Sequence, residues 1–543
     1  MRKYILLFAI MTVSVSLMAV PARRAFTDCM LTDGTTVQLT QAGDEYAHWY
    51  EDAEGNIYVS NSDGTFAPST ATRAEMCSRR HQALSSRNAH ARRAPMEFGV
   101  TPNLAPKGIV LLVNFADAEM NAEHTKAIFD ELFNSDSCTV NSYNSVHYPS
   151  AAEYFSAQSL GAYRPQFDVF GPLTLSQNYA YYGNNVTISG VELDEYAADA
   201  VIEACILAKQ QYDTINFADY DSDKDGFVDF VYVIYAGRGE ADGGLATTIW
   251  PHNWNISELV DSDLYPTKYD KSATMLDSVY LDSYAMSAEL DNNGLAGIGT
   301  LCHEFGHVLG LPDFYDTKYG TNYTQGLTPN DWDVMDGGAY NGDGHCPPNY
   351  SPWEKAFMGW LMPENPGSEG SKLTLYANGT DNYVAYQINE SGEQQAVTQE
   401  GVNYYIENRQ KRGWDEYLPA AGMLIWRVNY RASAWKNNVP NNTSRSPGYT
   451  LVIPSGKRIG GNNGAENVWP YRDVNSWSGV AGKPLTDITV NGSTIELIYI
   501  NDPDANTAVE LPEVQSGAVK MVRDGKMVIV HGDAVYSILG VRE

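Results

Sequence analysis

Two histidines, four residues apart in the stretch HEFGHVLGLPD, constrain this 543-residue chain more than any other feature. Side chains at positions i and i+4 lie on one face of a helix, so His303 and His307 can direct both rings at one metal ion. Glu304, the next residue along, then faces the substrate side. Gly310 fits a left-handed helix end, which turns the chain so that the carboxylate of Asp313 comes back to the metal. The stretch predicts a metal-binding helix that stops shortly before its third ligand.

This set of donors suits catalytic zinc. Two neutral imidazoles and one carboxylate leave Zn²⁺ with a net positive charge and an open fourth position, so the ion can bring the pKa of a bound water to about 7. Glu304 would take the proton of that water and later deliver it to the leaving amine. Two alternatives stay open. In the first, the third ligand is Asp316, one helical step past Asp313. In the second, the two histidines are incidental to an ordinary helix.

Four segments carry a resemblance to a known family. Residues 297–316, GIGTLCHEFGHVLGLPDFYD, resemble the active-site helix of the immune inhibitor A family of secreted bacterial metallopeptidases, which is related to the metzincins. Residues 108–117, GIVLLVNFAD, resemble the first strand of its catalytic domain, and residues 154–159, YFSAQS, the helix that follows. Residues 332–340, WDVMDGGAY, resemble the Met-turn, a methionine-bearing loop under the metal. The match runs from about residue 30 to residue 500.

The resemblance implies a secreted zinc metalloendopeptidase, made as a zymogen, that hydrolyses peptide bonds of extracellular proteins. It also implies that Met335 forms a hydrophobic floor beneath the zinc, since a thioether is a poor competitor for carboxylate and imidazole as a ligand here. Tyr340, shortly after the Met-turn, is a candidate hydrogen-bond donor to the tetrahedral oxyanion. The competing function is a secreted, cation-stabilised surface-binding protein with an inactive or structural metal site. A structural zinc normally has a fourth Cys or His ligand, so the donor set favours the enzyme.

The length of the chain suggests three or four folding units. We expect an α+β multidomain protein in which a metzincin-like catalytic domain, a mixed sheet plus the active-site helix, precedes a β-sandwich. Short strands between turns after residue 366 predict that sandwich. A basic start and an apolar run before Ala22 indicate a secretory signal. The predicted segments are a signal peptide at 1–22, a propeptide at 23–93, the catalytic domain at 94–365, the β-sandwich at 366–502, and a linker with a hairpin tail at 503–543.

The predicted propeptide ends in a basic stretch that closes with Arg92 and Arg93, which is typical of an activation linker, although an ordinary interdomain linker has the same composition. It holds two of the six cysteines, Cys29 and Cys77. Three arrangements are open for these two cysteines. They form a disulfide with each other, they remain free thiols, or Cys77 binds the zinc as a thiolate and keeps the enzyme latent. The sequence does not choose among these arrangements.

An acidic loop forms a second motif. Carboxylates at positions 1, 3 and 5 with glycine at position 6 wrap a hard cation, so this loop predicts a structural Ca²⁺. Position 12 is Tyr232 where an EF-hand has glutamate, and a buried strand follows in place of a helix. A solvated acidic turn is the alternative. The predicted calcium ligands are Asp221, Asp223, Asp225, the carbonyl of Phe227, and Asp229.

Charge and tail composition bear on partners and location. The net charge is −31, which argues against nucleic acid as a partner and leaves proteins or peptides as substrates. Beyond the signal no run of 18 apolar residues occurs, so no transmembrane segment is expected in the mature chain, and we expect it to be secreted or held at the bacterial cell surface. Residues 519–542 resemble C-terminal tails recognised by type IX export machinery, although a simple terminal hairpin fits them as well.

Overall fold

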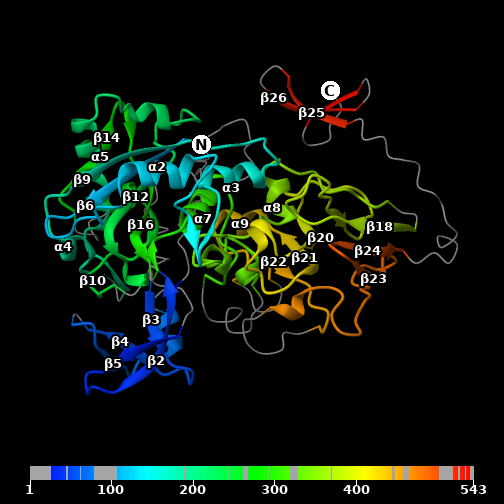
Figure 1. Cartoon of the computed structure of the whole chain (residues 1–543), viewed down its shortest axis with the longest axis horizontal. Coiled ribbons are helices and arrows are strands. Elements are labelled where there is room, and N and C mark those ends of the chain that lie inside the picture. Colours follow the sequence, from blue (N-terminus) through cyan, green and yellow to red (C-terminus); the bar gives the residue numbers. More distant parts are fainter. Residues whose placement is uncertain are drawn as a thin grey trace, which may run out of the picture.

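The structure is a computed structural model, and it arranges a small N-terminal sheet, a central sheet with helices, and two C-terminal sheets along the chain (Figure 1). It describes residues 22, 26–44, 47–61, 63–78, 107–188, 191–242, 244–260, 267–291, 293–317, 328–367, 370–442, 447–456 and 464–500, and the backbone of 518–523, 526–531 and 534–537. The predicted signal peptide (other than Ala22), the dibasic pair and the linker at 503–517 lie outside these residues.

The N-terminal sheet is an antiparallel meander in the order β1-β2-β3-β4-β5, and it protrudes from the main body below β16 (Figure 1). Two of its strands contain short alternating segments, at 36–39 and 57–59. One turn of helix at residues 73–78 follows it. The strands are β1 (Thr27–Met30), β2 (Thr36–Asp44), β3 (Ala47–Glu51), β4 (Ile57–Ser60) and β5 (Phe66–Pro68).

A mixed sheet forms the centre of the molecule, with strand order β13-β16-β12-β6-β9 and β17 paired to β16. The strands β16, β12, β6 and β9 run parallel, and β13 and β17 run antiparallel to β16. The parallel strands β6 and β12 are almost entirely apolar, as strands covered on both faces must be. The strands are β6 (Gly108–Asn114), β9 (Phe167–Thr174), β12 (Val231–Arg238), β13 (His252–Asn255), β16 (Ser283–Asp291) and β17 (Gly294–Leu295).

Helices cover both faces of this sheet. Successive strand residues point to opposite faces, and on β9 the ring of Phe167 contacts α2 and α7 while Phe170 contacts the end of α5. On the α7 side, α3 begins where the Ser150 hydroxyl accepts a hydrogen bond of 3.3 Å from the Glu153 amide. The helices are α2 (Lys126–Asn134), α3 (Ala151–Gln158), α4 (Tyr179–Gly183), α5 (Ala197–Gln211), α6 (Ile256–Val260), α7 (Gly299–Val308), α8 (Pro352–Phe357) and α9 (Ala432–Lys436).

The described part of this region also contains three short two-stranded hairpins. They are β7 (Ser142–Tyr143) with β8 (Val146–His147), β10 (Asn185–Ile188) with β11 (Val191–Asp194), and β14 (Met275–Leu276) with β15 (Val279–Tyr280). Single 3₁₀ turns connect other elements, and two of them, η4 (Asn330–Trp332) and η5 (Gly337–Tyr340), flank the predicted Met-turn.

The C-terminal region contains two antiparallel sheets that share one apolar core, and its classification as a β-sandwich stays a prediction. The four-stranded sheet also faces the central region, because the buried Trp426 and Tyr449 belong to the same core as the central strands. The central and C-terminal regions are therefore packed against each other across residue 365. The strands are β18 (Ser371–Leu375), β23 (Leu485–Asn491) and β24 (Thr494–Tyr499) in one sheet, and β19 (Tyr386–Ile388), β20 (Gly401–Arg409), β21 (Gly422–Tyr430) and β22 (Tyr449–Leu451) in the other.

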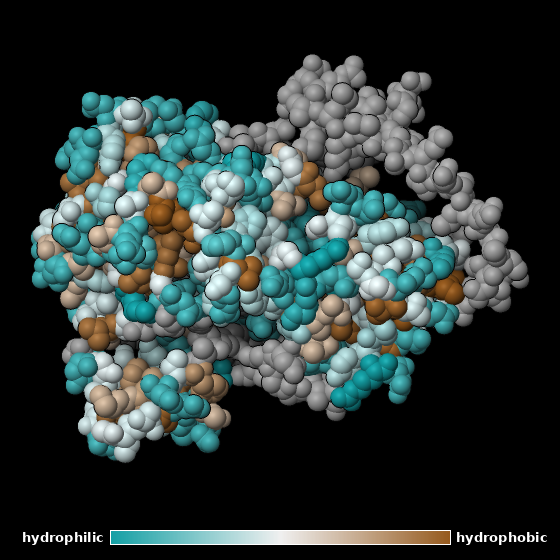
Figure 2. Space-filling model, viewed as in Figure 1, coloured by the Kyte–Doolittle hydropathy of each residue, from teal (hydrophilic) through white to brown (hydrophobic). Residues whose placement is uncertain are grey.

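The tail forms a three-stranded antiparallel sheet of β25 (Ala518–Arg523), β26 (Lys526–His531) and β27 (Ala534–Ser537). The predicted hairpin is confirmed, since Arg523 pairs with Lys526 around two connecting residues. Within the described residues, no helix has the length and apolarity needed to cross a membrane. The viewed face is mostly hydrophilic, with hydrophobic residues in small separate areas (Figure 2), in keeping with the charge of −31.

Candidate metal centre

Helix α7 is held against the central core by one side and presents its histidines on the other. The ring of Phe305 lies 5.2 Å from that of Phe155 on α3, 5.1 Å from Phe167 on β9 and 5.6 Å from Phe230. His303 and His307 point away from this aromatic cluster. The predicted helix and the predicted shared face of the two histidines are both confirmed.

The end of α7 has the conformation that the sequence predicted. Gly310 has a φ of +93°, in the left-handed region that glycine adopts without strain. Its amide donates to the His307 carbonyl at 2.9 Å, and the Leu311 amide donates to the Gly306 carbonyl at 3.1 Å. These two bonds form a Schellman motif, which reverses the chain direction and brings Asp313 back beside the helix.

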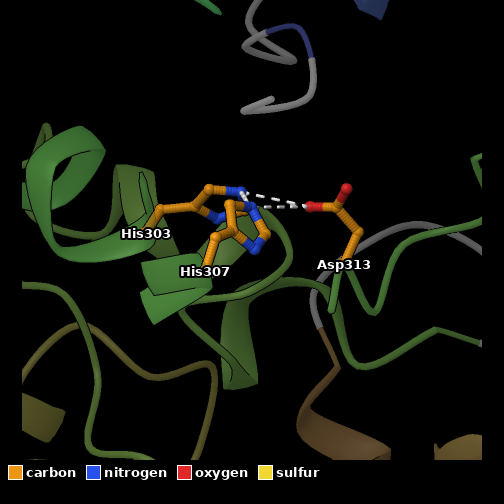
Figure 3. A group of neighbouring side chains, drawn as sticks. All are labelled: His303, His307 and Asp313. Atoms are coloured by element: carbon orange, nitrogen blue, oxygen red, sulfur yellow. Dashed lines mark hydrogen bonds and ion pairs between the residues drawn. The ribbon is translucent and has the colours of Figure 1, made fainter. Parts of the chain in front are cut away.

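The three predicted ligands converge in a fully enclosed place (Figure 3). Asp313 Oδ1 lies 3.2 Å from His303 Nε2 and 3.5 Å from His307 Nε2. The two Nε2 atoms are 3.1 Å apart. The described residues contain one other such group of three potential ligands, in the acidic loop, and Asp316 belongs to neither group although it too is buried.

Backbone carbonyls fix which ring nitrogens face the ligand group. His303 Nδ1 lies 2.7 Å from the Val334 carbonyl oxygen, and His307 Nδ1 lies 2.8 Å from that of Leu311. A carbonyl accepts only, so each Nδ1 carries the proton and donates it, and each Nε2 keeps its lone pair. Asp313 Oδ1 is buried and receives no hydrogen bond. Three electron-pair donors thus face one another without a proton between them, which fits a bound cation.

The charge states agree with this arrangement. Burial lowers the pKa of His307 and so favours the neutral imidazole that a metal requires. Burial alone would raise the pKa of Asp313, but the neighbouring His307 and His303 lower it to about 2. Asp313 is therefore an ionised carboxylate throughout the neutral range.

Met335 lies directly against α7. A Cβ atom added at Gly306 would lie 2.6 Å from Met335 Sδ, so the glycine in the HEFGH stretch is what allows the sulfur to approach the helix between the two histidines. The loop around Met335 also supports the ligands through its backbone. The Val334 carbonyl accepts from His303, and the Met335 carbonyl accepts from the Phe314 amide at 2.9 Å, next to Asp313.

The remaining predicted residues of this site are Glu304 and Tyr340. Glu304 is buried beside His303 on α7. Tyr340 ends η5, which packs on the first turn of α7, where a Cβ added at Gly299 would lie 1.9 Å from the Ala339 carbonyl oxygen. Tyr340 is not a member of the group of three potential ligands in the described residues.

Sequence reasoning missed Asn438, which follows α9 and is buried. Its Nδ2 donates to Asp313 Oδ2 at 2.5 Å, and its Oδ1 accepts from the Asp313 amide at 2.7 Å. Asn438 is 125 residues away from Asp313 in the chain and lies in no recognisable motif, so no local pattern could have indicated the contact.

Cys77 is not a member of the described ligand group, so the structure does not support it as the latent-state zinc ligand. It packs beside an apolar cluster that contains Trp49 and Tyr315, and Tyr315 follows Asp313 by two residues. None of the six cysteines, all of which lie in the described residues, forms a disulfide, which is contrary to the Cys29–Cys77 disulfide considered from the sequence.

The acidic loop brings three of its carboxylates together. Ligand atoms of Asp221, Asp223 and Asp225 lie within 4.8 Å of one another. Amides of the loop donate to them, with the Gly226 amide 3.1 Å from Asp221 Oδ2 and the Phe227 amide 2.9 Å from Asp225 Oδ1. Asp229 is not in this group, and its Oδ2 accepts from the Ser222 amide at 3.0 Å.

Known proteins resemble this chain in the same region. Residues 104–364 match the family model described as "Immune inhibitor A peptidase M6, catalytic domain". "Pre-pro-metalloprotease PrtV" of Vibrio cholerae serotype O1 is 30% identical over 286 residues, which cover 46% of this chain and 29% of that protein. "Immune inhibitor A" of Bacillus thuringiensis subsp. alesti is 27% identical over 284 residues, covering 46% of this chain and 39% of the relative. The aligned part thus spans well under half of either relative, and the family resemblance inferred from the sequence is confirmed.

Proposed function

Starting from an immune inhibitor A peptidase M6 catalytic domain at residues 104–364, we propose that this chain is a secreted zinc endopeptidase that cleaves extracellular proteins. One observation carries the proposal. His303 Nε2, His307 Nε2 and Asp313 Oδ1 converge as a proton-free, buried donor set on the helix that also bears Glu304. A tetrahedral zinc site with three protein ligands keeps one open position, which distinguishes catalytic from structural zinc.

In this proposal each residue has a separate task. His303, His307 and Asp313 hold the Zn²⁺, which when bound polarises the scissile carbonyl and favours ionisation of water. The Glu304 carboxylate accepts a proton from the attacking water and returns it to the nitrogen of the leaving amine. The hydroxyl of Tyr340 donates a hydrogen bond to the oxygen that becomes negative in the transition state.

We propose that the N-terminal sheet is part of a propeptide and that residues 23–93 hold the enzyme as a zymogen. The His48 ring stacks on Trp250 with 4.1 Å between centroids, and His48 Nε2 lies 3.2 Å from Glu240 Oε1. Trp49 packs in the cluster that contains Tyr315, close in sequence to Asp313. The cluster that contains Trp49 and Tyr315 joins the sheet to the segment that follows Asp313, so removal of the sheet would expose that segment to substrate.

Metal analysis combined with proteolysis tests the function. Full-length protein cut after Arg93 should bind one zinc and digest casein. Glu304→Gln should keep the zinc and lose about 10²–10⁴-fold in kcat, because only the proton acceptor is removed. Asp313→Ala should lose zinc and activity together, whereas Asp316→Ala should keep both. Tyr340→Phe should lower kcat and keep the zinc.

Two results would overturn the proposal. A chain that binds zinc but digests neither casein nor gelatin after cleavage would favour the surface-binding protein with a structural metal. If Asp316→Ala loses the zinc while Asp313→Ala retains it, the third ligand is Asp316, and the geometry described above does not represent the loaded site.

We further propose that the acidic loop binds a structural Ca²⁺ through Asp221, Asp223, Asp225 and the Phe227 carbonyl, with Asp229 as an outer member. Clustered carboxylates repel one another unless a cation neutralises them, and oxygen donors at this spacing suit a hard cation. The loop directly precedes the buried strand β12, so its closure would protect the central core from opening.

The tail is proposed to serve export. Residues 518–537 form a small antiparallel sheet after the linker at 503–517, a separate element that machinery of the type IX kind could recognise. Deleting residues 503–543 should leave zinc binding unchanged and reduce the amount of protein outside the cell.

A further inference from the structure

Asn438 contacts Asp313 at two points, and each bond uses a different part of both residues. The side-chain Nδ2 of Asn438 donates to Asp313 Oδ2, while the side-chain Oδ1 of Asn438 accepts from the backbone amide of Asp313. Both groups are almost fully enclosed, with 3% and 0% of their surfaces exposed. A closed pair of hydrogen bonds of this kind fixes the carboxylate plane relative to the backbone and leaves it little freedom to rotate.

The two carboxylate oxygens of Asp313 consequently have different partners. Oδ2 accepts the hydrogen bond from the side-chain Nδ2 of Asn438, whereas Oδ1 receives no hydrogen bond and faces the Nε2 atoms of His303 and His307. A carboxylate whose second oxygen already accepts a short hydrogen bond is directed to bind a metal through one oxygen only.

The backbone around Asn438 is fixed by its own neighbours. Asn438 has a φ of +49°, a left-handed conformation that asparagine tolerates better than most residues, and its amide donates to the Trp435 carbonyl at 3.0 Å. Trp435 is completely buried. Three residues on, Asn441 Nδ2 donates to the carbonyls of Phe314 and Tyr449, both at 2.6 Å. The loop after α9 is thus clamped to the segment that carries Asp313.

From these contacts we propose that Asn438 is a positioning residue that makes Asp313 a one-oxygen ligand of the catalytic metal. The inference rests on the proposed function. It places an essential part of the metal centre outside residues 104–364, so the C-terminal region completes the catalytic unit and is more than an appended module. It also accounts for the shared apolar core between the two regions, because a ligand is held accurately only when its support is rigid.

The test uses the full-length chain carrying Glu304→Gln, so that self-cleavage does not disturb the measurements. Asn438→Gly deletes both hydrogen bonds and keeps the backbone, since glycine adopts a positive φ freely. Asn442→Gly is the matched control, because Asn442 lies in the same loop and bonds Thr317 at 2.7 Å, with no bond to the ligands. Asn438→Ser, which keeps a polar but shorter side chain, serves as a second variant should Asn438→Gly fold poorly.

Two quantities are measured for each chain: the dissociation constant of zinc, by competition with a chelator, and the visible absorption spectrum after loading with Co²⁺. Loss of a metal-supporting hydrogen bond should weaken zinc binding by about 10- to 100-fold. The Co²⁺ spectrum of Asn438→Gly should also change in intensity, because a freed carboxylate binds through both oxygens. Asn442→Gly should match the parent chain in both.

A purely structural role for Asn438 would lower the melting temperature of the metal-free chain and leave the Co²⁺ spectrum unchanged. That result, or zinc affinity equal to the parent in both Asn438 variants, would overturn the inference while leaving the zinc site intact. If the parent chain itself fails to bind zinc, the proposed function is what has failed. The two failures are therefore distinguishable by the parent chain alone.

Discussion

Gly306→Ala is the perturbation for which the structure makes the most specific prediction. Alanine is the better helix former by about 1 kcal/mol, so in an unconstrained helix this change would stabilise the protein. Here the new methyl group would lie 2.6 Å from Met335 Sδ and 3.0 Å from the Tyr350 hydroxyl. Both side chains are fully buried, so neither can move aside into solvent.

The size of the effect follows from these two opposing terms. Forcing an extra carbon into a filled core typically costs about 1–3 kcal/mol. After subtraction of the helix gain, Gly306→Ala should destabilise the chain by roughly 0–2 kcal/mol. In a Met335→Ala background the closer contact is absent and only the Tyr350 contact remains, so the same change should range from neutral to stabilising by about 1 kcal/mol. The coupling between the two positions is then about 1–3 kcal/mol.

The assay is urea unfolding of the four chains of this cycle, zinc-free and in the Glu304→Gln background, followed by tryptophan fluorescence. Zinc affinity is the second readout, since displacing the loop moves the Val334 carbonyl that holds His303 Nδ1. Gly306→Ala alone should weaken zinc binding. If it stabilises the chain equally with and without Met335, the methionine does not pack against α7, and the described support of the histidines is refuted.

The remaining predictions concern calcium and acid. Chelating Ca²⁺ from the mature enzyme should lower its melting temperature and speed autolysis without removing zinc. The double substitution Asp223→Ala with Asp225→Ala should have the same effect as chelation. If neither chelation nor the double substitution changes the melting temperature, the loop is a solvated turn. Burial lowers the pKa of His345 from 6.5 to about 4. As the pH falls, the unfolded chain therefore binds the proton before the folded chain does. The free energy of unfolding should decrease by an amount on the order of 3 kcal/mol between pH 6.5 and pH 4. His345→Gln, which keeps a hydrogen bond to Asn141, should reduce the dependence of the unfolding free energy on pH, measured by urea unfolding at several pH values. An unaltered pH dependence would contradict the assignment of this effect to His345.

Much of the metal centre was predictable because its parts are close together in the chain. The spacing of His303 and His307 defines a helix face, and Gly310 defines the helix end, so the arrangement of these residues follows from backbone geometry alone. The choice of Asp313 over Asp316 did not follow, because both lie within reach after a bend. The structure brings Asp313 to the histidines through the Schellman turn and through Asn438.

The N-terminal and C-terminal regions show the opposite balance. Their strands were predictable from alternation and turn residues, but their placement was not. Pairing of Trp49 with Tyr315, and of Asn438 with Asp313, joins residues that are far apart in sequence and share no periodicity.

The sequence by itself predicted the chemistry proposed for this protein: the candidate ligand types, the helix that carries two of them, and the resemblance to a metallopeptidase family. Only the tertiary structure decided which carboxylate faces the histidines, which nitrogens keep their lone pairs, and which distant loop holds the third ligand in place. The physical reason is that short-range spacing is imposed by backbone geometry, whereas the partners of a buried polar group are chosen by the packing of the whole chain.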